Sequence, residues 1–204
     1  MKHHLFWIGL LSGMLLLASC TSIPLVKPQP TSTPGPLDLV KAFADANNRG
    51  DIEAVMALFV QDNPSVNDEG IGEVRGVTDV RKEREFMMGL ETKYQFNDCK
   101  IENKALVTCT ASTTNAATDA WKTPAFKISL VSFNIINNHI LELVTQGVTP
   151  SPKFQELGPK MDEWMKTNYP EDFNLLMGPL ETALTREVGE MYAKRIREFA
   201  KTLP

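Results

Sequence analysis

Apolar residues recur every three or four positions in three segments of the first half of the chain, a spacing typical of amphipathic helices. The first predicted helix covers residues 37–48, and the second begins at its N-cap Asp51. The third covers residues 79–90, with Thr78 as its expected N-cap. The apolar residues expected on the buried faces are Leu39, Val40, Phe43, Ile52, Val55, Met56, Phe59, Val80, Phe86, Met87 and Leu90.

The middle of the chain alternates apolar and polar residues at the period of two that marks β-strands. Strands are predicted over residues 94–101 and 105–111, which a short loop joins. Two more are predicted over residues 126–136 and 139–146, and the dipeptide NN at 137–138 favours a tight hairpin turn between them. The pattern predicts an antiparallel sheet.

Helical spacing returns after residue 150 and continues almost to the end of the chain. Pro170 interrupts it, and the last helix is predicted to begin at Pro179, because proline is favoured in a first helical turn. The apolar stripe of this last helix is Leu180, Leu184, Val188, Met191, Tyr192, Ile196 and Phe199. Helices, then a sheet, then helices predict an α+β fold with a C-terminal helical extension.

The start of the chain has the pattern of an export signal. Lys2 precedes an apolar run over residues 5–17, which is shorter than the roughly 20 residues that span a bilayer. The sequence LASC at residues 17–20 resembles the lipobox of bacterial lipoproteins, in which the cysteine is acylated and becomes the first mature residue. Residues 1–19 are therefore interpreted as a signal peptide. The alternative is an ordinary signal cut near Ala18.

Residues 20–36 are interpreted as a tether that carries the lipid at Cys20. Its prolines, which oppose regular structure, are Pro24, Pro28, Pro30, Pro34 and Pro36. Acyl chains on a cysteine attach a protein to a membrane that it does not cross. The expected location is outside the cytoplasm, on the cell membrane or the outer membrane.

Charge and cysteine content fit this location. The chain carries a formal net charge of −4, which argues against nucleic acid as a partner. With Cys20 assigned to lipid, Cys99 and Cys109 remain, and exported proteins meet oxidising conditions. A loop at 103–105 places these two cysteines opposite each other on adjacent strands, which predicts a disulfide. Two buried free thiols are the alternative.

Four short sequences resemble the NTF2-like (SnoaL-like) superfamily in their order and spacing. They are NRGDI at 48–52, ALF at 57–59, GVTDVR at 76–81 and NNHI at 137–140. The resemblance implies a cone in which N-terminal helices pack on a curved antiparallel sheet around a cavity. We expect an NTF2-like domain over residues 37–148 and a helical extension over 149–204 packed on the same domain. Members of the superfamily catalyse reactions, bind small molecules or bind proteins.

Ketosteroid isomerase is a member whose catalytic positions can be compared with this chain. Its tyrosine, base and protonated acid correspond to Phe43, Asn67 and Leu130, none of which has the required group. Asp68 adjoins Asn67, so a one-residue shift restores the base alone. Isomerase chemistry of this type is therefore not expected.

Other candidate chemistry is sparse. His139 is the only histidine after residue 4, and beside a turn it is expected to be solvated; the alternative is a general base. A single histidine disfavours a metal site or a catalytic triad. The mixed charges at residues 81–85 are interpreted as a solvated helix face rather than a binding patch.

The sequence favours a binding domain, without a cofactor, for a small apolar ligand or a protein partner. The candidate cavity lining is Phe43, Tyr94, Trp121 and Leu130, although core packing explains each of these residues as well. The first alternative is an isomerase-like or dehydratase-like enzyme that uses Asp68, Tyr94 or Glu142. A homodimer through the exposed sheet face is the second.

Overall fold

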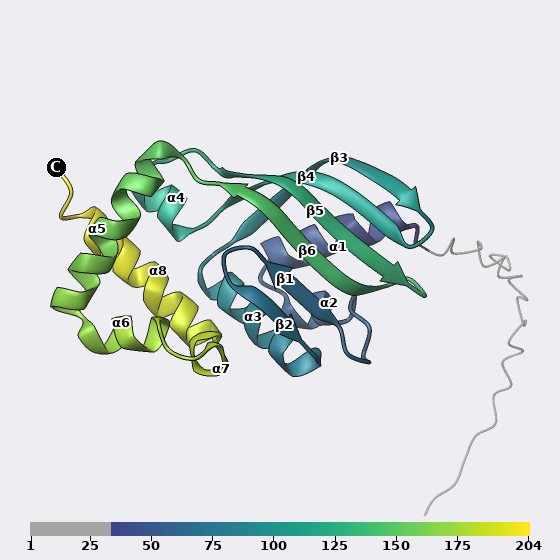
Figure 1. The fold of residues 1–204 in the computed structure, drawn as a ribbon, viewed down its shortest axis with the longest axis horizontal. Helices are drawn as coiled ribbons and strands as arrows, with labels where there is room; N and C mark the ends of the chain where they lie inside the picture. The colour runs from purple at the N-terminus through teal and green to yellow at the C-terminus, as the bar shows by residue number, and fades with distance from the viewer. Residues whose placement is uncertain (1–33) are drawn as a thin grey trace, which may run out of the picture. The chain divides into compact units, whose positions relative to one another are not determined.

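Residues 34–204 are described by the computed structural model (Figure 1), and the predicted signal peptide and Cys20 lie outside the described residues. One sheet of six strands has the order β2-β1-β6-β5-β4-β3. Strands β1 and β6 pair in parallel, and the other neighbours pair antiparallel. The strands are β1 (Ser65–Asp68), β2 (Gly72–Arg75), β3 (Lys93–Asn103), β4 (Leu106–Thr114), β5 (Phe126–Ile136) and β6 (His139–Thr149).

Three helices lie on one side of this sheet (Figure 1): α1 (Pro36–Asn48), α2 (Ile52–Met56) and α3 (Val77–Gly89). The main core lies between these helices and the sheet. Beyond one end of the sheet lie α4 (Ala116–Trp121), α5 (Pro152–Asn168), α6 (Pro170–Leu176), α7 (Leu180–Ala183) and α8 (Arg186–Ala200). The predicted α+β class is confirmed: N-terminal helices pack on a curved sheet, and helices extend the C-terminal end.

Two predicted helix boundaries in the first half are wrong. The second helix was expected to include Phe59, but it ends at Met56, because Phe59 forms a bridge with Ile140 of β6, where its side chain is fully buried. The N-cap of α3 is Gly76 rather than Thr78. Gly76 has a φ of 85°, a conformation that glycine adopts without steric cost.

The C-terminal half also departs from the prediction at two points. Helix α4 was not predicted, although its N-cap Asn115 and Thr118 form a capping box that the sequence contains. The predicted single last helix is split into α7 and α8, because the side chain of Thr185 accepts a hydrogen bond from the backbone of Val188 and starts a new helix. None of the described helices is both long and apolar enough to cross a membrane.

Two glycines set the contact between α3 and α8. A Cβ atom on Gly89 would lie 2.3 Å from the carbonyl oxygen of Arg186, and one on Gly189 would lie 2.4 Å from that of Phe86. The two backbones therefore approach more closely than any side chain allows. This crossing joins the extension to the helix that faces the main core.

We expect Gly189→Ala to lower the free energy of unfolding by about 1–3 kcal/mol, because the added methyl group overlaps the backbone of α3. Gly158→Ala is the matched control. A Cβ atom on Gly158, in α5, would meet no neighbouring element within 4 Å, so alanine there should stabilise the helix by about 0.5–1 kcal/mol. Urea unfolding of the two variants measures both effects, and equal behaviour would contradict the close crossing.

Candidate functional site

A charged pair on α3 lies inside the main core. The side chains of Glu83 and Arg84 are both fully buried and form a two-pronged ion pair with each other. The interpretation of residues 81–85 as a solvated face is therefore wrong for these two residues. Glu83 and Arg84 follow the buried Val80 by three and four residues, and helix positions at this spacing share a face. The sequence spacing therefore indicated that both residues are buried.

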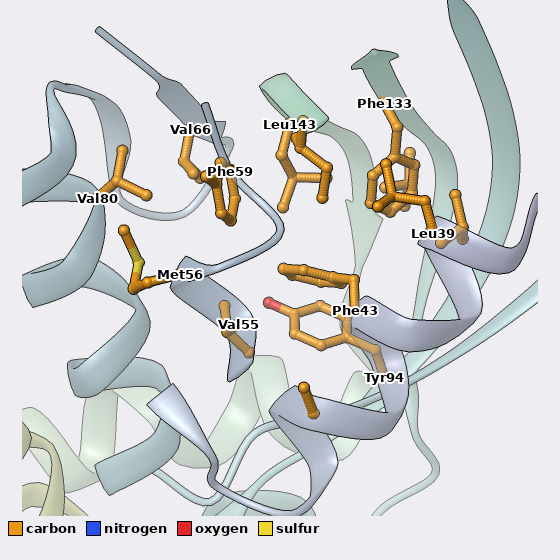
Figure 2. Close-up of a cluster of buried hydrophobic side chains, with 14 of the residues drawn as sticks. Leu39, Phe43, Val55, Met56, Phe59, Val66, Val80, Tyr94, Phe133 and Leu143 are labelled. Atoms are coloured by element: carbon orange, nitrogen blue, oxygen red, sulfur yellow. The ribbon is translucent and has the colours of Figure 1, made fainter. Parts of the chain in front are cut away.

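Aromatic rings surround the guanidinium group of Arg84. Its Cζ atom lies 5.9 Å from the ring centre of Phe43 and 6.0 Å from that of Tyr94, within the range of cation–π attraction. One of its nitrogens also lies 3.5 Å from the Tyr94 hydroxyl. Figure 2 shows that Tyr94 directs this hydroxyl into the buried cluster rather than towards solvent.

Burial and the charges of neighbouring groups together determine the ionisation of this cluster. Burial raises the pKa of Glu83, whose carboxyl the guanidinium of Arg84 keeps in an ion pair. Burial acts to lower the pKa of Arg84, but Glu83, Tyr94 and Asp68 together outweigh it, so the pKa is raised and Arg84 stays charged. Burial also raises the pKa of Tyr94 to about 12, so its phenol is neutral near neutral pH.

Asp68, one of the candidate bases, lies near this pair but is occupied. Its carboxylate accepts hydrogen bonds from the hydroxyl of Thr145, at 3.0 Å, and from the backbone of Gly70, at 2.9 Å. Its negative charge contributes to the raised pKa of both Glu83 and Tyr94. Glu142 does not join them, because it is half-buried and out of phase with the inward-facing Leu143 and Thr145.

The four candidate lining residues are not brought together. Phe43 and Tyr94 belong to the packed main core, and Trp121 belongs to a second apolar cluster among α4, α5 and α8. Leu130 is half-buried on the opposite face of β5 from the buried Val131. Phe43 is fully buried, and the hydroxyl of Tyr94 points into the packed core, so this hydroxyl is not open to a substrate.

An apolar groove of about 300 Å³ lies between α1 and β3, at the free edge of the sheet. Its size is at the lower limit for small-molecule sites. Tyr94 is the one candidate lining residue that reaches it. The groove is lined by Leu37, Val40, Lys41, Ala44, Asp45, Asn48, Tyr94, Gln95, Phe96 and Cys99.

Two asparagines at the end of α1 bond to β3 and to the residue just before it, and Asn48 also lines the groove. The side chain of Asn48 donates to the carbonyl oxygen of Tyr94 and accepts from its backbone N–H, both at 2.8 Å. Asn47 donates to the carbonyl oxygen of Thr92 at 3.0 Å. These bonds satisfy edge-strand groups that would otherwise lack partners. The sequence pattern predicted Asn48 only as the end of the first helix, and it did not predict the bonds of either asparagine.

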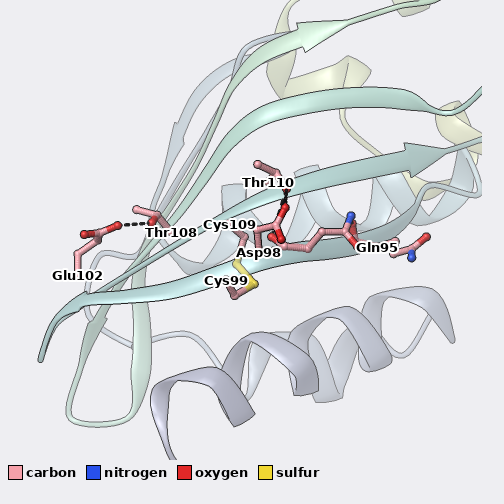
Figure 3. Close-up of a disulfide and its surroundings, with 8 residues drawn as sticks. Gln95, Asp98, Cys99, Glu102, Thr108, Cys109 and Thr110 are labelled. Atoms are coloured by element: carbon pink, nitrogen blue, oxygen red, sulfur yellow. Dashed lines mark hydrogen bonds between the residues drawn. A yellow bond between two sulfur atoms is a disulfide. The ribbon is translucent and has the colours of Figure 1, made fainter.

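The predicted disulfide Cys99–Cys109 is present (Figure 3), and Cys99 lines the same groove. Ile101 pairs with Val107 in the expected register, and a bulge lies between Asn97 and Lys100. Asp98, within the bulge, has a φ of 51°. The disulfide therefore links β3 to β4 next to an irregular part of the edge strand.

A second groove, of about 310 Å³, lies between β2, α3 and the α7 segment. Its apolar lining is Val74, Leu180 and Leu184, and its charged lining is Glu73, Arg75, Asp79 and Lys82.

His139 is exposed, and its Nδ1 atom lies 2.9 Å from the carbonyl oxygen of Asn137. Within residues 34–204, no three His, Cys, Asp or Glu side chains gather closely enough to hold a metal ion.

No protein-family model matches the chain, and no curated protein matches it. Among solved structures it is similar to an NTF2-like protein of unknown function from Cytophaga hutchinsonii ATCC 33406, with 17% identity, 61% of this chain and 98% of that chain covered, and a TM-score of 0.49. A protein from Kribbella flavida DSM 17836 has 16% identity, coverage of 65% and 99%, and a TM-score of 0.50. At these identities the likeness concerns the fold alone.

We expect Arg84→Met to lower the free energy of unfolding by about 3–5 kcal/mol, because it leaves the Glu83 carboxyl buried without its partner. The double variant Glu83→Leu/Arg84→Met should be more stable than Arg84→Met alone. Arg81→Met, on the same helix, removes an exposed pair with Glu53 and should cost much less. Urea unfolding compares the variants, and equal losses for Arg81→Met and Arg84→Met would contradict the buried pair.

The stability of the protein should fall as the pH rises above about 10. Tyrosine titrates near 10.0 in the unfolded chain, whereas burial raises the pKa of Tyr94 and of Tyr192 to about 12. The unfolded state therefore loses these protons first, at a cost of about 1–2 kcal/mol per tyrosine by pH 11.5. Tyr94→Phe should reduce this fall, as urea unfolding at pH 8 and pH 11.5 would show. An unchanged fall would contradict the burial of Tyr94.

Proposed function

We propose that this protein is an extracytoplasmic lipoprotein, anchored by lipid at Cys20, whose NTF2-like domain binds a small apolar molecule in the groove between α1 and β3. The groove is the observation that carries this proposal. Leu37, Val40, Ala44 and Phe96 give it a largely apolar lining, and it lies beside an interior that side chains already fill.

The anchoring part of the proposal rests on the sequence. Residues 1–19 have the order of charge, apolar run and small residues of an export signal, and Cys20 stands where a lipobox has its acylated cysteine. The disulfide Cys99–Cys109 supports an oxidising compartment, because such bonds persist there.

Catalysis by Asp68, Tyr94 or Glu142 has less support. An active site needs ionisable groups that converge on a space open to substrate. Here Asp68 and the hydroxyl of Tyr94 are buried among packed side chains, and Glu142 lies apart from them. A homodimer through the outer face of the sheet and the expected lack of nucleic-acid binding stay predictions.

A protein partner is a second candidate, favoured by one surface. Leu175, Met177 and Leu180 are exposed within a short stretch of chain at the end of α6 and the start of α7. Leu180 also lines the second groove, whose charged residues have both signs. Apolar patches with a polar rim are typical of protein contacts.

An intact-mass spectrum of the native protein, with extraction of bound molecules, tests the primary proposal. We expect acyl mass on Cys20, the loss of residues 1–19, the two-hydrogen deficit of the disulfide and a carried apolar molecule. Cys20→Ala should remove the acyl mass and leave residues 1–19 attached, because the cut is made before the acylated cysteine. A chain that keeps Lys2 and has no acyl mass would contradict the anchoring.

A pair of variants on α1 tests the groove. Ala44→Phe should fill it and weaken the binding of the neutral fluorescent probe N-phenyl-1-naphthylamine at least tenfold, since Ala44 lines its wall. Ala42→Phe is the control, because Ala42 lies on the same helix and lines a different hollow, beside α2. Equal probe binding by the two variants would contradict a ligand site in this groove.

A further inference from the structure

One end of the sheet gathers the point where the described chain begins and the turns of two hairpins. Pro34 and the start of α1 lie at this end, together with the β3–β4 and β5–β6 turns (Figure 1). The β3–β4 turn is joined to β5, because the backbone N–H of Ile135 donates to the carbonyl oxygen of Ala105 at 2.6 Å. We call this region the hairpin-tip end.

Large apolar side chains are exposed at this end. Leu37, Ile101 and Ile136 keep 43%, 50% and 48% of their surface exposed, at the start of α1 and near the two turns. Ile101 precedes the β3–β4 turn, and Ile136 precedes the β5–β6 turn. Among the described residues, the other exposed large apolar side chains are those of the α6–α7 stretch.

We infer that the hairpin-tip end rests on the lipid bilayer, with Leu37, Ile101 and Ile136 in contact with its apolar layer. This inference rests on the proposed anchoring at Cys20. Only residues 21–33 separate Cys20 from Pro34, and they span at most about 50 Å even when fully extended. The anchor therefore holds this end at a high effective concentration beside the membrane.

The charges at this end favour an apolar contact rather than an electrostatic one. Lys100 and Lys104 are exposed there, and Glu102 and Asp98 oppose them. A basic cluster that would select anionic lipids is not formed by these residues. The contact should therefore form on phosphatidylcholine and change little with salt.

The same placement identifies where the apolar ligand of the proposed function would enter. Leu37 is both a residue of the hairpin-tip end and part of the groove lining. Asn48 lines the groove at the other end of α1. The Leu37 end of the groove would then face the lipid, which makes a lipid-soluble molecule the fitting class of ligand.

Spin labelling of the full acylated protein tests the inference. Single cysteines at Ile101→Cys, Ile136→Cys and Leu175→Cys accept a nitroxide label, because the native cysteines are acylated or in the disulfide. On phosphatidylcholine vesicles, labels at 101 and 136 should lose at least threefold in collision rate with a water-soluble nickel chelate and gain in collision with oxygen. Leu175, 43% exposed and at the opposite end, is the matched control and should not change.

The outcomes separate the inference from the proposed function. An acylated protein that floats with vesicles but keeps labels 101 and 136 open to nickel would overturn the orientation alone. A protein without acyl mass would overturn both. Lys104→Cys, in the exposed β3–β4 turn, is a second reporter whose label needs no apolar residue to be replaced.

Discussion

The buried ion pair of Glu83 and Arg84 is the constraint on which the rest of this domain depends. Two charges removed from water are tolerated only where each meets a partner and the surrounding groups complete the environment. Here the partners are consecutive residues of one helix, and the rings of Phe43 and Tyr94 cover the guanidinium. Helix α3 is thereby fixed in rotation against both α1 and β3.

The other side of α3 carries a different constraint. Gly89 has no side chain, and it therefore permits backbone contact with α8. The buried ion pair fixes one side of α3, and close backbone packing against α8 fixes the other. The filled interior and the attached extension are therefore two results of how one helix is placed. Neither of them fills the apolar groove between α1 and β3, at the free edge of the sheet.

Much of the fold was predictable from local pattern. The long hairpin of β5 and β6 and the disulfide pairing followed from alternation and from turn geometry, because neighbouring residues determine both. The buried charges were missed, since their environment is made by β3 and α1, which are distant in the sequence. The split between α7 and α8 was missed because Thr185 interrupts a helical stripe without changing its apolar spacing.

The candidate site was less predictable than the fold. Tyr94 was chosen as an aromatic residue of a strand, and it does reach the groove, but Trp121 and Leu130 lie elsewhere. Which face a strand residue presents after a bulge depends on pairing irregularities, such as the one between Cys109 and Ala111, that alternation alone does not locate.

The attachment of α1 has a mechanical consequence. Its last two residues bond to the sheet edge, Asn48 to Tyr94 of β3 and Asn47 to Thr92 just before it, whereas the first described residue, Pro34, lies near its opposite end. A load applied at Pro34 acts on α1 as a lever that pivots on those two asparagines. The buried Leu39 and Phe43 resist that torque. Tension on the chain would therefore first change the width of the groove between α1 and β3.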